Sequence, residues 1–511
     1  MQKIDKFRQL FVLAFLLLIV TECLSLLGFV FPAVNTVVFF LISIFVVYLS
    51  IHTFPYAVSV LFAELIIGGK GYLFSYTFGS FDISIRLVLF GIVVLGGIVH
   101  VLKSKSFGLR EEGLATAWTV TVIAVAYGIG RGILSHNSFK NIFLDANGYL
   151  YLAAAIPVFQ VIRDQVNLRR IASVVGAALT VLVGKTIFVL GYFSHTPSEG
   201  ALRTVYRWIR VTGVGEMTNY GYNIYRVFFQ SHVFLFVPLF VSIVMLQFAQ
   251  HFSLSKKIRY FLWGSVVLSS SAVCISFSRS FWVAIAGVVF LYLLYLLVSK
   301  KISLKRVVVF LGASLAVLCV DILLLTAVIN FPLPGGGGSG ISAATLVRDR
   351  ITEGGEEAAL SSRMQLLRPL ATAAKEHLFF GSGLGTTVSY QTKDPRALQS
   401  SGGVYTTYAF EWGYLDLLVK FGLFGMLAYL MFFFVIIKKL WRSAEKNTSL
   451  SGVLLFGFLL AYLALLATHM TTPYLNHPLG IGFTILLAYA FCSLFPRESK
   501  SVPVGISKDF N

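Results

Sequence analysis

The chain has 511 residues, of which 57% are hydrophobic and only 12% are charged. Soluble domains carry about 25% charged residues, so this composition and a mean hydropathy of +0.82 exclude a protein whose main solvent is water. A net charge of +19 would suggest nucleic-acid binding in a soluble protein. Here, however, the Lys and Arg residues lie in short clusters between apolar runs, and membrane topology explains that pattern better.

Apolar runs that are long enough to cross a bilayer recur from Leu10 to near the C-terminus. A hydrocarbon layer of about 30 Å needs roughly 20 mostly apolar residues per helix. The first run follows a basic stretch, but it is long and leads into another span, so we expect a retained helix rather than a cleaved signal peptide. The sequence thus predicts an all-α polytopic integral membrane protein with about 12 to 14 transmembrane helices. We place the spans near 10–29, 33–51, 54–69, 84–102, 113–131, 148–162, 169–192, 228–249, 257–277, 279–299, 305–329, 408–437, 451–468 and 477–495.

The basic clusters between these spans indicate how the chain is oriented. With the N-terminus in the cytoplasm, more than half of the 41 basic residues fall on the cytoplasmic side, at 103–110, 163–170, 256–259, 300–306 and 438–446 and at both termini. The positive-inside rule predicts this distribution. We therefore expect both termini in the cytoplasm and two long segments outside, at about 194–227 and 330–407.

This layout divides the chain into four regions. They are N-terminal transmembrane helices at 1–329, an extracytoplasmic loop at 330–407, C-terminal transmembrane helices at 408–496 and a cytoplasmic tail at 497–511. The loop opens on a Pro- and Gly-rich stretch at 332–338, and helix-like pieces follow near 341–352 and 361–378. Leucines recur at helical spacing in the second piece, which indicates an amphipathic helix on the membrane surface.

Neither a metal nor a cofactor is expected. All four cysteines (Cys23, Cys274, Cys319 and Cys492) lie inside apolar runs, as small packing residues do. The histidines are scattered, without the spacing of a metal site. The glycine-rich run 381–385 lacks the Lys-Ser/Thr that follows a phosphate-binding loop, so we expect no nucleotide site.

Ionisable residues at membrane depth are costly and usually have a role. The candidates are Glu22, Glu64, Lys185, Arg279, Asp321, Glu411, Asp416 and Lys420. Arg279 lies in a turn between two spans, where a fixed guanidinium can bind a phosphate through two hydrogen bonds. The alternative for Arg279 is an interfacial arginine whose head group reaches out to water.

The predicted outer segments add further arginines. Several such groups at a membrane surface suit a pyrophosphate, because its charge demands several donors in a region of low dielectric constant. The alternative for each of them is a solvated surface charge, since the 330–404 stretch also carries six acidic residues. The arginines are Arg203, Arg207, Arg210 and Arg226 in the first segment and Arg348, Arg350 and Arg363 in the second.

Glu411 lies among aromatic residues where the long loop re-enters the membrane. Burial by these neighbours would raise the pKa of the carboxylate and make it a useful general base. Trp412 and Tyr414 can stack on sugar rings. The alternative is a carboxylate that pairs with a nearby Lys or Arg and serves packing alone.

Three stretches together resemble the O-antigen ligase and O-antigen polymerase family of bacterial envelope glycosyltransferases. Residues 276–280, Ser-Phe-Ser-Arg-Ser, resemble the family's Ser-x-Ser-Arg turn. Residues 363–385 resemble its loop helix and Gly-x-Gly-x-Gly end, and residues 414–425 resemble the helix that follows the loop. Their order, their spacing and the long loop extend the likeness over roughly 230–440. Where the family has a His-Asn pair before the Tyr-Leu pair, this chain has Glu411-Trp412.

The resemblance implies a GT-C-like fold in the bacterial cytoplasmic (inner) membrane, with an extracytoplasmic active site. It also implies a glycan donor on a polyprenyl pyrophosphate such as undecaprenyl pyrophosphate, and a glycan or glycolipid acceptor. The family histidine is thought to deprotonate the acceptor hydroxyl, and Glu411 can do the same. On this reading Arg279 and Arg363, helped by Arg207, Arg210 or Arg348, bind the pyrophosphate in a metal-independent, inverting transfer. Polymerisation is slightly favoured over ligation.

A protein of another class, a flippase or transporter of lipid-linked oligosaccharides, also needs many helices and cationic groups. We would expect such a protein to line a central cavity with charge and to have short outer loops. In this chain the charge gathers beside one long loop, which favours the enzyme.

Overall fold

We describe the fold from a computed structural model. It describes residues 2–79, 81–105, 113–161, 165–195, 198–219, 224–299, 303–331, 358–392, 398, 401–446 and 449–494. The predicted helix at 341–352 and the candidates Arg348 and Arg350 lie outside these residues.

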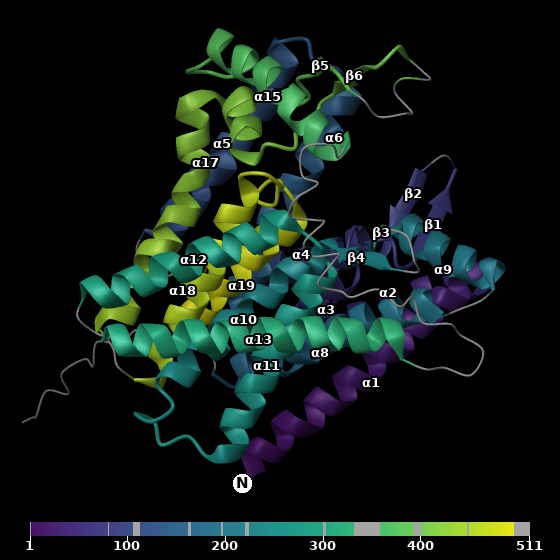
Figure 1. The fold of residues 1–511 in the computed structure, drawn as a ribbon. Helices are drawn as coiled ribbons and strands as arrows, with labels where there is room; N and C mark the ends of the chain where they lie inside the picture. The colour runs from purple at the N-terminus through teal and green to yellow at the C-terminus, as the bar shows by residue number, and fades with distance from the viewer. Residues whose placement is uncertain are drawn as a thin grey trace, which may run out of the picture.

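The chain up to His195 forms mainly helices (Figure 1). Pro32 and Pro55 stand in the first turns of their helices, where a missing N–H costs nothing. Ser84 caps the next helix, because its hydroxyl accepts a hydrogen bond from the Leu87 amide (3.3 Å). The elements are α1 (Gln2–Val30), α2 (Pro32–His52), α3 (Phe54–Ile67), α4 (Ile85–Ser104), α5 (Leu114–Leu134), α6 (Phe139–Tyr149), η1 (Leu150–Ala154), α7 (Ala155–Val161) and α8 (Gln165–His195).

The rest of the chain, from residue 198 onward, contains the longest helix and the segment that precedes it. Helix α17 runs over 34 residues, but its backbone is not helical at Gly422, so it consists of two helical parts joined at a break. The elements are α9 (Glu199–Val211), η2 (Gln230–Leu235), α10 (Phe236–Gln247), α11 (Lys256–Ile275), α12 (Arg279–Val298), α13 (Leu304–Asn330), α15 (Ala358–Glu376), α17 (Gly413–Lys446), α18 (Leu450–His469) and α19 (Pro478–Leu494).

Twelve helices among the described residues are long and apolar enough to cross a membrane, and α3 and α19 are shorter apolar helices. The predicted all-α polytopic fold is therefore confirmed, and every predicted span coincides with helical structure. The spans leave large apolar side chains on the outside, such as Leu315 and Leu323 of α13, which are 62% and 67% exposed. A bilayer accommodates such side chains, whereas water does not.

Among the described residues, three short antiparallel hairpins lie between the helices, and none of them was predicted from the sequence. They are β1 (Ser75–Phe78) with β2 (Phe81–Ser84), β3 (Gly215–Asn219) with β4 (Tyr225–Phe229), and β5 (Val388–Gln391) with β6 (Val404–Thr407). Each strand has only four or five residues, too few for an alternating pattern to be distinguished from a loop.

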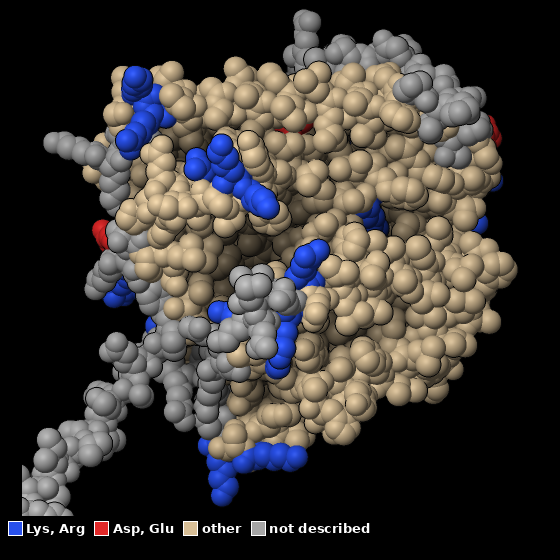
Figure 2. Space-filling model, turned by 90° about the horizontal axis from the view of Figure 1, so that it is seen from below, with Lys and Arg blue, Asp and Glu red and all other residues tan. Residues whose placement is uncertain are grey.

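Lysine and arginine side chains gather on the face seen from below, where acidic side chains are few (Figure 2). The beginning of α1 lies at this end of the molecule (Figure 1). In the same view, β5 and β6 lie at the top and β1 to β4 and α9 lie at the right, so the hairpins lie away from the beginning of α1.

Candidate active site

A tight turn joins α11 to α12 and presents Arg279. Phe277 adopts the left-handed conformation (φ 47°), which is rare for a bulky residue, and its side chain is buried. The Arg226 guanidinium on β4 donates to the Ser276 carbonyl oxygen (2.9 Å). Arg279 follows as the half-buried first residue of α12. The turn thus fixes the position of the Arg279 backbone, and the sequence predicted such a turn between the two spans.

The structure brings together two other predicted residues, Arg363 of α15 and Glu411 at the start of α17. Their side chains form an ion pair, and the Trp412 indole donates to the Arg363 carbonyl oxygen (2.8 Å). Both charged side chains remain accessible, since 34% of Arg363 and 51% of Glu411 is exposed. The burial that we expected from the aromatic neighbours of Glu411 is therefore not present.

A single turn between α18 and α19, residues 470–477, contacts both the Arg279 turn and the start of α17. The Thr472 hydroxyl donates to the Ser280 hydroxyl (3.3 Å), beside Arg279. The Asn476 amide donates to the Asp416 carboxylate (2.8 Å), one helical turn after Glu411. Arg279 and the Arg363–Glu411 pair consequently lie at the same end of the helix bundle, on opposite sides of this turn.

A buried ionic cluster anchors the start of α17. The Lys420 ammonium pairs with Asp416 one turn earlier (2.6 Å) and with Asp145 of α6 (2.7 Å). Lys420 is 1% exposed, Asp145 7% and Asp416 0%. The sequence had marked Asp416 and Lys420 as buried charges but missed Asp145, because residues 139–149 did not look like a transmembrane span.

Tyr408 adds a donor near this cluster. Burial raises the pKa of its phenol, and the Asp145 carboxylate raises it further, against the opposite effect of Lys420. The hydroxyl therefore keeps its proton at neutral pH and can donate a hydrogen bond. Nothing in the sequence around Tyr408 had pointed to this role.

A histidine, His469, lies beside Gly413 and Tyr414. Its ring is 4.8 Å from that of Tyr414, and its Nδ1 accepts hydrogen bonds from the backbone amides of Tyr474 and Leu475 (3.0 and 3.2 Å). The Tyr414 hydroxyl donates to the Leu466 carbonyl oxygen (3.0 Å). His469 is fully buried, and its Nδ1 holds the 470–477 turn.

The glycine-rich run 381–385 fastens the long segment to the break in α17. Glycines 381, 383 and 385 have positive φ, as does Gly422 at the break. The broken helix leaves carbonyl groups without helical partners, and the amides of Ser382 and Gly383 donate to those of Val419 and Lys420 (2.8 and 2.9 Å). These amides therefore donate to protein oxygens, and the run holds the long segment against the break in α17. We call this contact of residues 381–385 the glycine lock.

We expect Gly383→Ala to destabilise the protein strongly. The left-handed conformation (φ 85°) costs an alanine about 1 kcal/mol, and the new Cβ would overlap the backbone of Gly132 in α5. The melting temperature in detergent should fall by several degrees or the folded protein should be lost. Gly402→Ala is the matched control, because Gly402 also has positive φ (62°) but open space around it. Equal effects of the two substitutions would contradict the lock.

The predicted arginines Arg207 and Arg210 lie elsewhere at this end. They are exposed on α9, which contacts α1 and β3, and Arg210 pairs with Glu216 of β3 (3.6 Å). Helices α9 and α15 are well separated in Figure 1. Among the described residues, Arg210 pairs with Glu216 and Arg363 pairs with Glu411, so the two arginines have different partners.

Other buried ion pairs hold helices together away from the candidate site. Lys185 binds both oxygens of Glu22 (2.6 and 2.7 Å), and Arg86 binds Glu64 (2.8 Å). Asp321 accepts hydrogen bonds from Ser270 and Ser271. The two ion pairs and the hydrogen bonds of Asp321 join the helices on which these residues lie.

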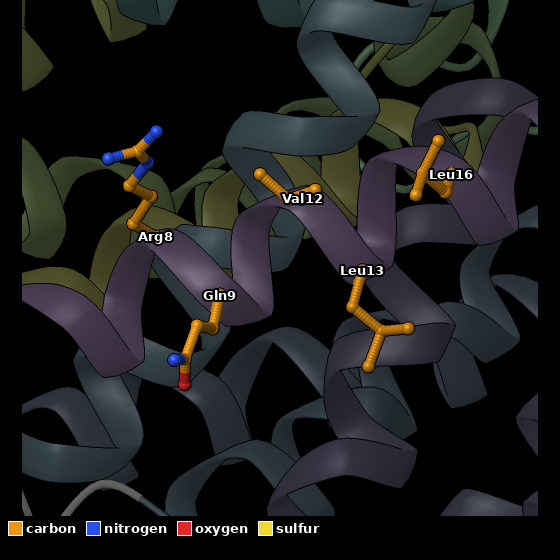
Figure 3. Close-up of a pocket in the computed structure, with 5 residues that line it drawn as sticks. All are labelled: Arg8, Gln9, Val12, Leu13 and Leu16. Atoms are coloured by element: carbon orange, nitrogen blue, oxygen red, sulfur yellow. The ribbon is translucent and has the colours of Figure 1, made fainter.

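A hollow of about 500 Å³ lies against α1, lined by Arg8, Gln9, Val12, Leu13 and Leu16 (Figure 3). All five side chains come from a single helix, and most are apolar. The hollow is far along the chain from the candidate site and contains no carboxylate. Within the described parts of the chain, no three His, Cys, Asp or Glu side chains lie close enough together to bind a metal ion.

The sequence of residues 264–430 matches the O-antigen ligase family. No curated protein matches the chain. The matched region begins in α11 and ends within α17, so it includes Arg279, Arg363, Glu411 and the glycine run. The resemblance seen in the short motifs is confirmed, because residues 264–430 of this membrane protein match the O-antigen ligase family model.

Proposed function

We propose that the chain is a membrane glycosyltransferase of the O-antigen polymerase or ligase type. It transfers a glycan from a polyprenyl pyrophosphate to a sugar hydroxyl of an acceptor. The observation that supports this most directly is the accessible Arg363–Glu411 pair, which joins a phosphate-binding group to a carboxylate base within the matched domain. Arg279 lies at the same end, across the 470–477 turn.

In the proposed mechanism, donor binding frees the base. The pyrophosphate carries more charge than a carboxylate, so it displaces Glu411 from the Arg363 guanidinium. Glu411 then takes the proton of the acceptor hydroxyl, and the resulting oxygen attacks the anomeric carbon. The bond between that carbon and the pyrophosphate oxygen breaks, and its electron pair leaves with the pyrophosphate. Arg279 and Arg363 stabilise the charge that develops on the leaving group, and attack from the opposite side inverts the anomeric centre.

The surrounding side chains supply sugar contacts. Trp412 is half-buried with one edge held by the Arg363 carbonyl, so its indole offers a fixed face for stacking. Tyr414 is a weaker candidate, because its hydroxyl and its ring are engaged with α18. Arg348 remains a candidate third cation for the pyrophosphate. Arg207 and Arg210 are left out of the transfer step, because their helix packs on α1 and β3 rather than on α15 or α17.

We further propose that the protein lies in a bacterial inner membrane with both termini in the cytoplasm and the site outside. The basic face in Figure 2 supports this orientation, since cytoplasmic loops are rich in Lys and Arg. The hairpins lie away from the beginning of α1 (Figure 1). An extracytoplasmic site fits a donor that stores its energy in the sugar–phosphate bond, because such a donor needs no nucleotide.

Transfer by the purified protein in detergent tests the proposal. With a polyprenyl-pyrophosphate-linked glycan and a glycan acceptor, we expect longer glycans on a gel without an added nucleotide. Arg279→Ala should lower the rate by about 100- to 1,000-fold, whereas Arg368→Ala, an exposed position of α15, should not. A flippase would show no transfer in detergent and would move the donor only across sealed vesicles, and that pair of results would replace our proposal with the rival.

The glycans of a deletion strain separate the two reactions within the class. Loss of long chains while single repeats stay attached to the acceptor is the result that we expect for a polymerase. Loss of all attached glycan would instead indicate a ligase. The slight preference for polymerisation rests on Glu411-Trp412 in place of the His-Asn pair of the ligase-type pattern.

A further inference from the structure

We infer that α9 and the adjacent β1–β2 hairpin form a surface that binds the anionic head groups of bilayer phospholipids. The surface consists of the α9 arginines Arg203, Arg207 and Arg210 and the hairpin residues Phe78 and Phe81. It is separate from the Arg279, Arg363 and Glu411 site, and it does not depend on the glycan-transfer proposal.

Helix α9 has one buried face and one basic face. Trp208 and Ile209 are 5% and 0% exposed, and the Trp208 indole donates to the Ser25 hydroxyl of α1 (3.1 Å). Arg203, Arg207 and Arg210 follow one another at intervals of four and three residues, which places them on the same exposed face. Tyr206 and Val211 beside them are 40% and 64% exposed. This is the pattern of a helix that lies in the membrane interface.

The contacts of α9 place it at the level of the membrane surface. Span α8 ends at His195 and α9 begins at Glu199, so only a few residues separate them. Ser25, which holds Trp208, lies near the end of the span Lys6–Val30. A helix fixed at both points cannot extend far into water.

The β1–β2 hairpin continues this surface with two aromatic rings. The Lys70 amide, in the turn before β1, donates to the Gly213 carbonyl oxygen just after α9 (2.9 Å). Figure 1 shows the hairpin and α9 at the same corner. Phe78 and Phe81 face each other in the strand register and are 69% and 74% exposed. Exposed aromatic rings beside guanidinium groups suit the boundary between acyl chains and phosphates.

The positive charge of this surface favours the binding of anionic lipid head groups. Guanidinium groups bind phosphate oxygens through paired hydrogen bonds, and each basic residue near a bilayer strengthens the attraction to anionic lipid about fivefold. Arg210 contributes less than Arg203 and Arg207, because Glu216 already neutralises part of its charge (3.6 Å). Removal of the Glu216 charge should therefore strengthen lipid binding.

The experiment measures binding of phosphatidylglycerol to the full chain in detergent by native mass spectrometry. Simultaneous replacement of Arg203, Arg207 and Arg210 by Gln should raise the Kd of the tightest-binding phosphatidylglycerol at least tenfold. The same three replacements by Lys keep the charge and should raise it less than threefold. Glu216→Gln should lower the Kd about two- to fivefold. Phosphatidylcholine, which has no net charge, should bind all four proteins alike.

Three outcomes would overturn the inference. One is an unchanged Kd in the Gln variant whose melting temperature equals that of the wild type. Another is an equal loss after Arg368→Gln with Lys375→Gln, two exposed basic residues of α15. The third is a Gln variant that keeps its phosphatidylglycerol but loses binding of inorganic pyrophosphate, which would assign the arginines to the donor.

Discussion

Replacement of Glu411 by Gln abolishes glycan transfer if the carboxylate is the general base. Glutamine keeps the size of the side chain and can still contact Arg363, but it cannot take the proton of the acceptor hydroxyl. Loss of a general base lowers kcat by about 100- to 10,000-fold. The measurement is the initial rate of transfer with purified protein, together with the level of lipid-linked donor in cells, which should accumulate.

The controls for Glu411 separate chemistry from structure. Half of the side chain is exposed, so the melting temperature of Glu411→Gln should stay within a few degrees of the wild type. Glu376→Gln, at the exposed end of α15, removes a carboxylate from the same segment and should keep its activity. Full transfer by Glu411→Gln would return Glu411 to a packing role as the partner of Arg363.

The second large effect concerns stability. Lys420→Met leaves Asp145 and Asp416 buried together without the cation that both of them contact. Breaking a buried ion pair in this way costs about 3 to 5 kcal/mol, because a buried charge loses its compensation. We expect little folded protein after extraction, measured as the monodisperse fraction in size-exclusion chromatography and as the melting temperature.

A rescue variant tests whether charge is the cause. When Asp145→Asn and Asp416→Asn accompany Lys420→Met, no net charge remains in the cluster, and much of the folded protein should return. Lys438→Met, at an exposed position of α17, is the matched control and should behave like the wild type. A triple variant no better than Lys420→Met would show that packing around the lysine, and not the charge, decides stability.

The membrane spans were predictable from the sequence because their signal is additive over some 20 residues. The Arg279 turn was also predictable, since a short polar stretch between two apolar runs leaves little room for anything else. The Arg363–Glu411 ion pair could not be predicted as a contact, because 48 residues separate its members. Only the docking of α15 on α17 brings them together.

Asp145 shows a different limit of sequence reasoning. It belongs to α6, a helix of modest hydropathy that continues through η1 into α7, and only together are these pieces long enough to span a membrane. The hairpins and the glycine lock could not be predicted from the sequence for a similar reason. They are defined by hydrogen bonds between distant segments, such as that from Leu384 to Gly128 (2.9 Å), and no local pattern encodes such a partner.

The buried ion pairs also bear on the order in which the chain assembles during synthesis. Arg86 follows Glu64 by 22 residues, so α3 and α4 can enter the bilayer as one neutral unit. Lys185, the partner of Glu22, is synthesised 163 residues later, and Lys420, the partner of Asp145, is synthesised 275 residues later. Until its partner has been made, each of these carboxylates is an unpaired ionisable group within a span, which is costly. The ion pair that neutralises Asp145 therefore forms only after the ribosome has made the start of α17.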